Sequence, residues 1–122
     1  EAKELSSAVS RATVATLREL GDSSEFLSTL VNQYVGDTKQ RLATLRTAAG
    51  KADVDVIEHT ANSLKSSSAS MGADRMAQIC SKLEALGRTR NIEGVQDLLN
   101  QASGEFETIR EELNQILSGP GS

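Results

Sequence analysis

The side chains that could do chemistry are concentrated in one serine-rich segment in the middle of the chain. His59, Asn62 and Lys65 follow one another there at intervals of three residues. On an α-helix this spacing places them one turn apart on the same face. The imidazole of His59, the only histidine, could serve as a nucleophilic acceptor or a docking residue, although a solvated surface histidine is the simpler interpretation. The Lys65 ammonium could offset the negative charge of a group that approaches Asn62, or it could be a solvated surface lysine.

Other catalytic or metal chemistry finds little support in the sequence. A single histidine cannot build a metal site, and the carboxylates lack the paired Glu-x-x-His motifs of a di-iron bundle, so we expect neither a metal nor a cofactor. Cys80, the only cysteine, falls within an apolar stripe, which predicts a buried small hydrophobe rather than a reactive thiol. The acidic cluster of Glu105, Glu107, Glu111 and Glu112 is predicted to be a solvated face.

Composition excludes several classes of function. A net charge of -4 and only three aromatic residues argue against binding to nucleic acid or to anionic lipid. A single cysteine cannot form an internal disulfide, which fits a reducing, cytoplasmic compartment. No apolar run approaches the ~20 residues that a membrane span needs. Because the sequence begins at Glu1 without a methionine, we expect it to be part of a longer protein.

The elements that must position these side chains are all expected to be helices. Helix-forming residues dominate, and no segment alternates apolar and polar residues as a strand does. A short first helix is predicted from Val9 to Leu20. A long second helix is predicted from an Asp22 and Glu25 capping pair to about Gly50. Inside it, Gly36 indicates either close packing or a kink.

Three further helices follow, each with its own start signal. Asp53 is predicted to cap the third, which ends at Gly72, and the fourth then runs to a stop signal at Gly87. Asn91 is predicted to cap the last helix, whose apolar stripe begins at Ile92. Short connections between amphipathic helices predict an all-α, antiparallel four-helix bundle with an additional short N-terminal cap helix. We expect residues 1–117 to form this domain and residues 118–122 to be a flexible tail or a remnant of cloning.

A helical wheel divides the serine-rich helix into two faces. The inner face is predicted to carry Ile57, Ala61, Leu64, Ser68 and Met71. The outer face is predicted to carry Asp55, Glu58, His59, Asn62, Lys65, Ser66 and Ala69.

This segment resembles the central motif of histidine-containing phosphotransfer (HPt) domains. That family carries a histidine, then leucine two positions on, lysine three on, a small residue four on, and an apolar-glycine-alanine end. The matching residues here are Leu64, Lys65, Ser66, Met71, Gly72 and Ala73, with Cys80, Leu83, Glu84 and Leu86 in the next helix and Leu17, Glu19, Leu20, Gly21 and Phe26 upstream. The resemblance covers roughly residues 9–117.

In this register the phosphoacceptor position holds Asn62 instead of histidine. An amide nitrogen shares its lone pair with the carbonyl and is a poor nucleophile, so we expect this copy not to accept phosphate. Asn62 has two possible origins: a deliberate histidine-to-asparagine change, or a naturally degenerate domain that only binds. The otherwise intact motif favours the deliberate change.

The resemblance implies a phosphocarrier, not an enzyme by itself, that relays phosphate between receiver-domain aspartates in two-component signalling. It implies receiver domains of response regulators as partners, and a hybrid sensor kinase as the parent chain, whose C-terminal module this domain would be. The expected site comprises Asn62 and Lys65, with Glu58, His59, Ser66 and Ala69 binding the partner. The alternatives are an adaptor that binds a receiver or kinase without phosphotransfer, and a purely structural bundle.

Overall fold

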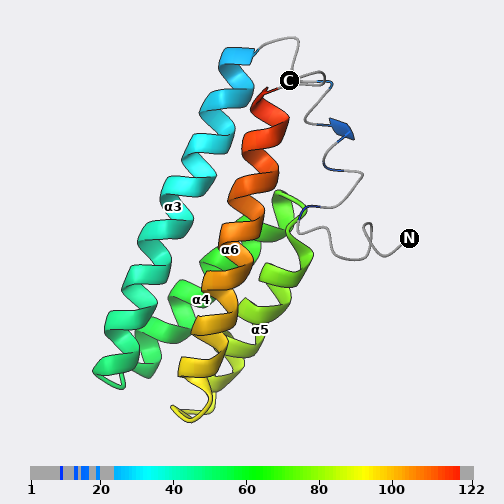
Figure 1. Ribbon diagram of the computed structural model, residues 1–122. Coiled ribbons are helices and arrows are strands. Elements are labelled where there is room, and N and C mark those ends of the chain that lie inside the picture. The colour runs from blue at the N-terminus through cyan, green and yellow to red at the C-terminus, as the bar shows by residue number, and fades with distance from the viewer. Residues whose placement is uncertain (1–8, 10–12, 14, 17–18, 20–23, 119–122) are drawn as a thin grey trace.

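Apolar residues at intervals of three and four produce four antiparallel helices in this computed structural model, which describes residues 9, 13, 15–16, 19 and 24–118. No strand occurs among those residues. The helices are α3 (Ser24–Gly50), α4 (Val54–Ser70), α5 (Asp74–Arg88) and α6 (Val95–Ser118). Figure 1 shows α3 descending, α4 ascending, α5 descending and α6 ascending.

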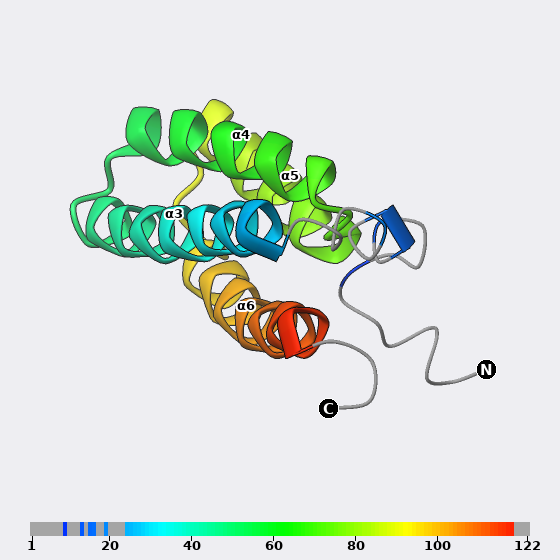
Figure 2. The same cartoon turned by 90° about the horizontal axis from the view of Figure 1, so that it is seen from above.

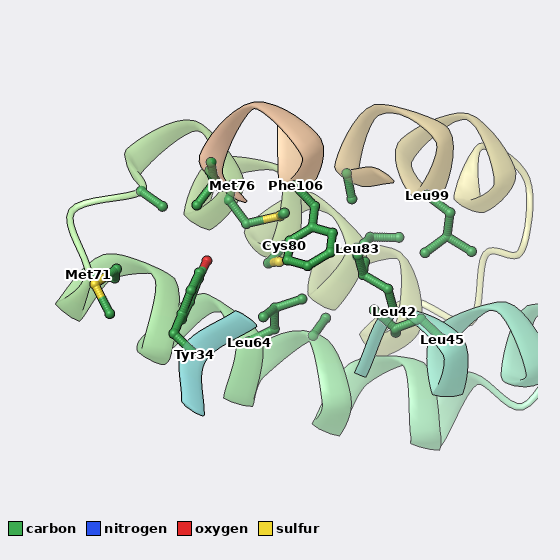
Figure 3. Packing of buried hydrophobic residues seen from close by; sticks show 14 of the residues in the cluster. Tyr34, Leu42, Leu45, Leu64, Met71, Met76, Cys80, Leu83, Leu99 and Phe106 are labelled. Atoms are coloured by element: carbon green, nitrogen blue, oxygen red, sulfur yellow. The ribbon is translucent and has the colours of Figure 1, made fainter. Parts of the chain in front are cut away.

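The four helices form a closed ring around one core. Each packs on the next along the chain, α6 returns to α3, and the most extensive contact joins α4 to α5. The view from above in Figure 2 shows α3 between α4 and α6. The buried side chains that Figure 3 labels include Tyr34, Leu42, Leu45, Leu64, Met76, Cys80, Leu83, Leu99 and Phe106.

Two of the predicted helix boundaries follow from recognisable end signals. The Asp53 carboxylate accepts a hydrogen bond from the Val56 backbone N–H at 3.3 Å, which confirms the predicted cap of α4. At the other end, Gly72 has a φ of 77°, and it breaks the chain between α4 and α5 as expected. Because the connections from α3 to α4 and from α4 to α5 are short, these neighbouring helices must run antiparallel.

The start of the last helix was predicted wrongly. Helix α6 begins at Val95, not beside Asn91. The Asn91 side chain instead accepts a hydrogen bond from the Glu93 N–H at 3.0 Å, within the loop, and Ile92 is 39% exposed. An asparagine that bonds to the backbone two residues on stabilises a turn as readily as a helix start, and here the turn prevails.

The fourth helix ends beside Gly87 as predicted, but Gly87 is not the residue that ends it. Helix α5 continues to Arg88, and the residue in the left-handed conformation after it is Arg90, with a φ of 59°. Gly87 is a buried residue inside the helix. Its role is therefore in packing, not in ending the helix.

Helix α3 departs from expectation at two residues. Phe26 belongs to the predicted apolar pattern but is 53% exposed. Apart from the nearby backbone of α3 itself, nothing lies within 4 Å of the place where a Cβ on Gly36 would be, so close packing does not account for this glycine. The expected N-terminal cap helix and the Asp22 cap fall largely on residues outside the described part of the chain.

The acidic cluster on α6 is only partly solvated, contrary to expectation. Glu107 and Glu111 are exposed, but Glu105 is largely buried and pairs with Arg75, at 3.3 Å between Nε and Oε2. Glu112 accepts a hydrogen bond from the backbone N–H of the buried Val9 at 3.0 Å. Carboxylates on the edges of the helix thus bind the neighbouring elements.

None of the helices in the described residues combines the length and the apolar character that crossing a membrane requires.

Candidate functional site

Helix α4 presents the predicted site on its outer face. Its apolar positions turn inward, and Ile57, Ala61 and Leu64 have no exposed surface. The opposite side of the helix faces solvent, as the helical wheel predicts. On that side His59, Asn62, Ser66 and Ala69 are exposed, while Glu58 and Lys65 are half-buried.

A buried hydrogen bond holds the serine-rich end of α4 against α3. The Ser68 hydroxyl lies 2.9 Å from the Tyr34 hydroxyl, and both side chains are buried. Burial raises the pKa of Tyr34, so its hydroxyl stays protonated and able to donate. Nearby, the Ser67 hydroxyl donates to the Leu64 carbonyl at 3.2 Å. These serines serve packing and local hydrogen bonding, as expected.

One carboxylate on α5 binds both residues of the predicted chemical site. Asn62 donates from Nδ2 to Glu84 Oε2 at 2.8 Å, and Lys65 donates from Nζ to Glu84 Oε1 at 2.7 Å. An ionised carboxylate only accepts hydrogen bonds, so the nitrogen of the amide must face it. The two oxygens of Glu84 therefore hold Asn62 and Lys65 side by side.

Glu84 is well suited to remain charged in this position. Its side chain is only 10% exposed, yet the hydrogen bond from Lys65, followed by that from Asn62, lowers the pKa of its carboxyl. These donors outweigh the burial, which acts in the opposite direction. A fixed negative charge thus lies directly beneath position 62.

Arg88 completes this group, which we call the Glu84 cluster: Asn62, Lys65, Glu84 and Arg88. Arg88 Nη2 lies 3.3 Å from Glu84 Oε2, the oxygen that also accepts from Asn62. Its Nε lies 3.6 Å from Glu58 Oε2 on α4. The Arg88 side chain is 60% exposed, so it can reach outward as well as across.

His59 takes no part in the cluster. Although it lies one turn before Asn62 on the same face, it makes no hydrogen bond or ion pair within the described residues. The remaining expected contact residues, Ser66 and Ala69, add small side chains to the exposed surface beyond Asn62. The structure therefore shows two parts of this face: Asn62 and Lys65, which are hydrogen-bonded to Glu84, and an open surface around them.

A sequence model of the Hpt domain family matches residues 29–119, which include all of this site. The chain belongs to the Hpt domain family. Domains of this family are phosphocarriers of two-component phosphorelays rather than enzymes. A search of curated protein sequences finds no significant match.

Two solved structures resemble this Hpt domain over most of its length. Histidine-containing phosphotransfer protein B (HptB) from Pseudomonas aeruginosa PAO1 is 27% identical, with a TM-score of 0.84; the match covers 93% of this chain and 96% of that one. Histidine-containing phosphotransfer protein ZmHP2 from maize is 23% identical, with a TM-score of 0.82 over 93% and 92% of the two chains. The maize protein shows the shared fold alone, and both agree with the four-helix bundle.

In the sequence, Glu84 stands out only as part of the HPt-like pattern of its helix, which indicates no role for it. A signal was nevertheless present, since Cys80, Glu84 and Gly87 share the inward stripe of α5, where a charged residue needs a partner. Arg88 was missed because nothing in its own spacing indicates which helix it faces. Within the described residues, no group of three or more histidine, cysteine or acidic side chains is arranged to hold a metal ion.

Proposed function

We propose that this Hpt domain docks receiver domains through the outer face of α4 and that Asn62 prevents it from accepting their phosphoryl group. The observation that carries this proposal is the Glu84 carboxylate, which accepts hydrogen bonds from Asn62 and Lys65 at once. This arrangement supports a site for accepting a phosphoryl group in which only the side chain of Asn62 is unsuited to the reaction.

The geometry explains what an imidazole at position 62 would gain. A ring N–H placed where Asn62 Nδ2 now lies would donate to Glu84 Oε2, which leaves the lone pair of the other ring nitrogen directed outward. That nitrogen would form a bond to phosphorus as the bond from phosphorus to the aspartyl oxygen breaks, and the receiver carboxylate would leave. Lys65 would offset charge on the transferred group. Asn62 has no comparable lone pair to offer.

The surface around position 62 suits the approach of a partner. Ser66 and Ala69 are small and exposed, so they leave the helix accessible, while Glu58 and His59 supply polar contacts at the other end. We infer that a receiver domain packs across these four residues. Signalling contacts of this kind are expected to be small and transient.

Docking can be tested by titrating purified receiver domains and measuring the dissociation constant. We expect Ala69→Arg, which adds bulk and charge to the proposed face, to raise the dissociation constant at least ~10-fold. Gln101→Arg makes a matched change at an exposed position on α6, the helix diagonal to α4, and should leave binding unaltered. Equal effects of the two substitutions, or no binding to any receiver, would favour a purely structural bundle.

A second proposal is a natural adaptor that binds a receiver or kinase without turnover. It is favoured by the hydrogen bond of Asn62 to Glu84, because the asparagine fits its position well. The gene of the parent protein distinguishes the two, since a histidine codon at position 62 would identify Asn62 as a deliberate change. In either case we place the domain in the cytoplasm, as the C-terminal module of a hybrid sensor kinase.

A further inference from the structure

Gly87 marks the closest approach between α4 and α5. A Cβ added to this glycine would lie 2.8 Å from the backbone nitrogen of Glu58, 2.9 Å from the carbonyl oxygen of Val54 and 3.0 Å from the Glu58 Cα. All three are backbone atoms, so no rotation of a side chain can make room. The two helices therefore touch backbone to backbone at this point.

The glycine lies between the two residues of α5 that reach across to α4. Glu84, three residues before it, binds Asn62 and Lys65, and Arg88, directly after it, approaches Glu58. Residues three or four apart on a helix share a face, one turn of about 5 Å apart. Glu84 and Gly87 therefore face α4 together, and the separation of the helices at Gly87 governs how far the Glu84 carboxylate must reach.

We propose that Gly87 is a positioning residue of the phosphoryl-handling site: by holding α5 against α4, it places the Glu84 carboxylate within hydrogen-bonding reach of position 62. This rests on the function proposed above, because it assigns Gly87 a part in that same site. Gly87 touches neither position 62 nor a phosphoryl group, and it acts through Glu84.

A methyl group at position 87 must push the helices apart. An ordinary van der Waals contact to an added Cβ is 3.4–4 Å long, whereas the Glu58 backbone nitrogen would lie at 2.8 Å. The hydrogen bond from Asn62 to Glu84, now 2.8 Å, has little tolerance for the same displacement, since such bonds weaken beyond about 3.2 Å. The longer and more flexible Lys65 can follow the carboxylate better than Asn62 can.

The chain contains two glycines that serve as matched controls. Gly36 in α3 and Gly104 in α6 are also inside helices, but neither has an atom within 4 Å of an added Cβ. Replacing either with alanine removes the same backbone freedom and causes no collision. Differences between Gly87→Ala and Gly104→Ala therefore report the contact with α4, not the loss of a glycine.

The first measurement is the carboxyl pKa of Glu84. It is obtained by carbon NMR during a pH titration of the full chain with Asn62 in place. We expect Gly87→Ala to move this pKa upward toward its ordinary value of 4.5, because the hydrogen bond from Asn62 is lost, whereas Gly104→Ala leaves it in place. A glycine that only stabilised the bundle would change the unfolding midpoint without moving the Glu84 pKa.

The second measurement is phosphoryl acceptance from a labelled receiver in the Asn62→His background. There we expect Gly87→Ala to slow acceptance by at least ~10-fold, because displacements near 1 Å at a reacting site carry large penalties, and Gly104→Ala to have no effect. If the Asn62→His chain accepts no phosphate at all, the proposed function fails, but the Glu84 pKa still decides the role of Gly87.

Two outcomes would overturn the role of Gly87. The first is a folded Gly87→Ala chain in which the Glu84 pKa keeps its lowered value. The second is a Gly87→Ala chain that stays unfolded even in a background stabilised by Gly36→Ala and Gly104→Ala, which would assign the glycine to the stability of the bundle.

Discussion

Asn62 donates a hydrogen bond from its side-chain nitrogen to Glu84 Oε2 at 2.8 Å, which links α4 to α5. Position 62 is therefore exposed on one side and held on the other. A side chain in this position has a fixed orientation before any partner arrives, and a nucleophile benefits from such an arrangement. The same bond explains how asparagine can occupy the position without disturbing the bundle.

Removal of the Glu84 charge is expected to destabilise the fold. We predict that Glu84→Gln lowers the free energy of unfolding at pH 7 by about 1–2 kcal/mol, because the carboxylate accepts charged hydrogen bonds that the amide cannot replace. The loss stays small because Lys65 and Arg88 can then bind water instead. Urea unfolding measures the change. Glu107→Gln removes an exposed carboxylate on α6 and serves as the control, and an equal loss there would contradict the prediction.

The contribution of Glu84 should depend on pH. Its pKa in the folded chain lies below the ordinary 4.5, so its stabilising effect is complete above that pH and is lost as the pH falls toward the folded value. We therefore expect the stability difference between the unmodified chain and Glu84→Gln to be greatest near pH 7 and to shrink by pH 3. Unfolding curves at pH 7, 5 and 3 check this, and a difference that widened with acid would refute the assignment.

The hydroxyl pair between α3 and α4 supplies a third prediction. Tyr34→Phe leaves the fully buried Ser68 hydroxyl without its partner, so we expect a loss of about 1–2 kcal/mol in the free energy of unfolding. The double variant Tyr34→Phe, Ser68→Ala should lose less free energy of unfolding than the two single variants together, because the unsatisfied hydroxyl is then removed. Strict additivity in the urea-unfolding data would mean that the two hydroxyls do not interact.

Cys80 should be unreactive in the folded chain. It has no exposed surface, and burial raises the pKa of its thiol to about 12. We expect a thiol reagent at pH 8 to label the native protein at least ~10³-fold more slowly than the urea-unfolded protein, because the thiolate is the reacting species. Rapid labelling of the native chain would show that the core around Cys80 opens.

Much of the fold could be predicted from local signals. Asp53 precedes an apolar pattern and caps α4, and Ile57, Ala61 and Leu64 recur at helical spacing and are buried. Such signals depend on residues close together in sequence, and the two faces of α4 follow directly from them. The role of Asn91 does not follow from its neighbours in sequence, because its side chain can stabilise a turn or a helix start with equal ease.

The candidate site was only half predictable for a different reason. Asn62 and Lys65 lie in one helix, where the resemblance to the HPt motif indicated both, but Glu84 belongs to another helix and its partners depend on how α4 and α5 pack. Gly87 was read as a stop signal because a glycine near the end of a helix usually is one. Only the three-dimensional contact with Glu58 shows its other use.

We infer that the side chain at position 62 alone keeps this domain from accepting a phosphoryl group. The most direct measurement incubates a labelled, aspartyl-phosphorylated receiver with the unmodified chain and with Asn62→His, each also carrying His59→Gln so that position 62 offers the only imidazole. We predict that label moves to the Asn62→His chain as an acid-labile phosphoramidate and that none moves to the chain with Asn62. Label on the Asn62 chain, or none on a folded Asn62→His chain that binds the receiver, would contradict this account.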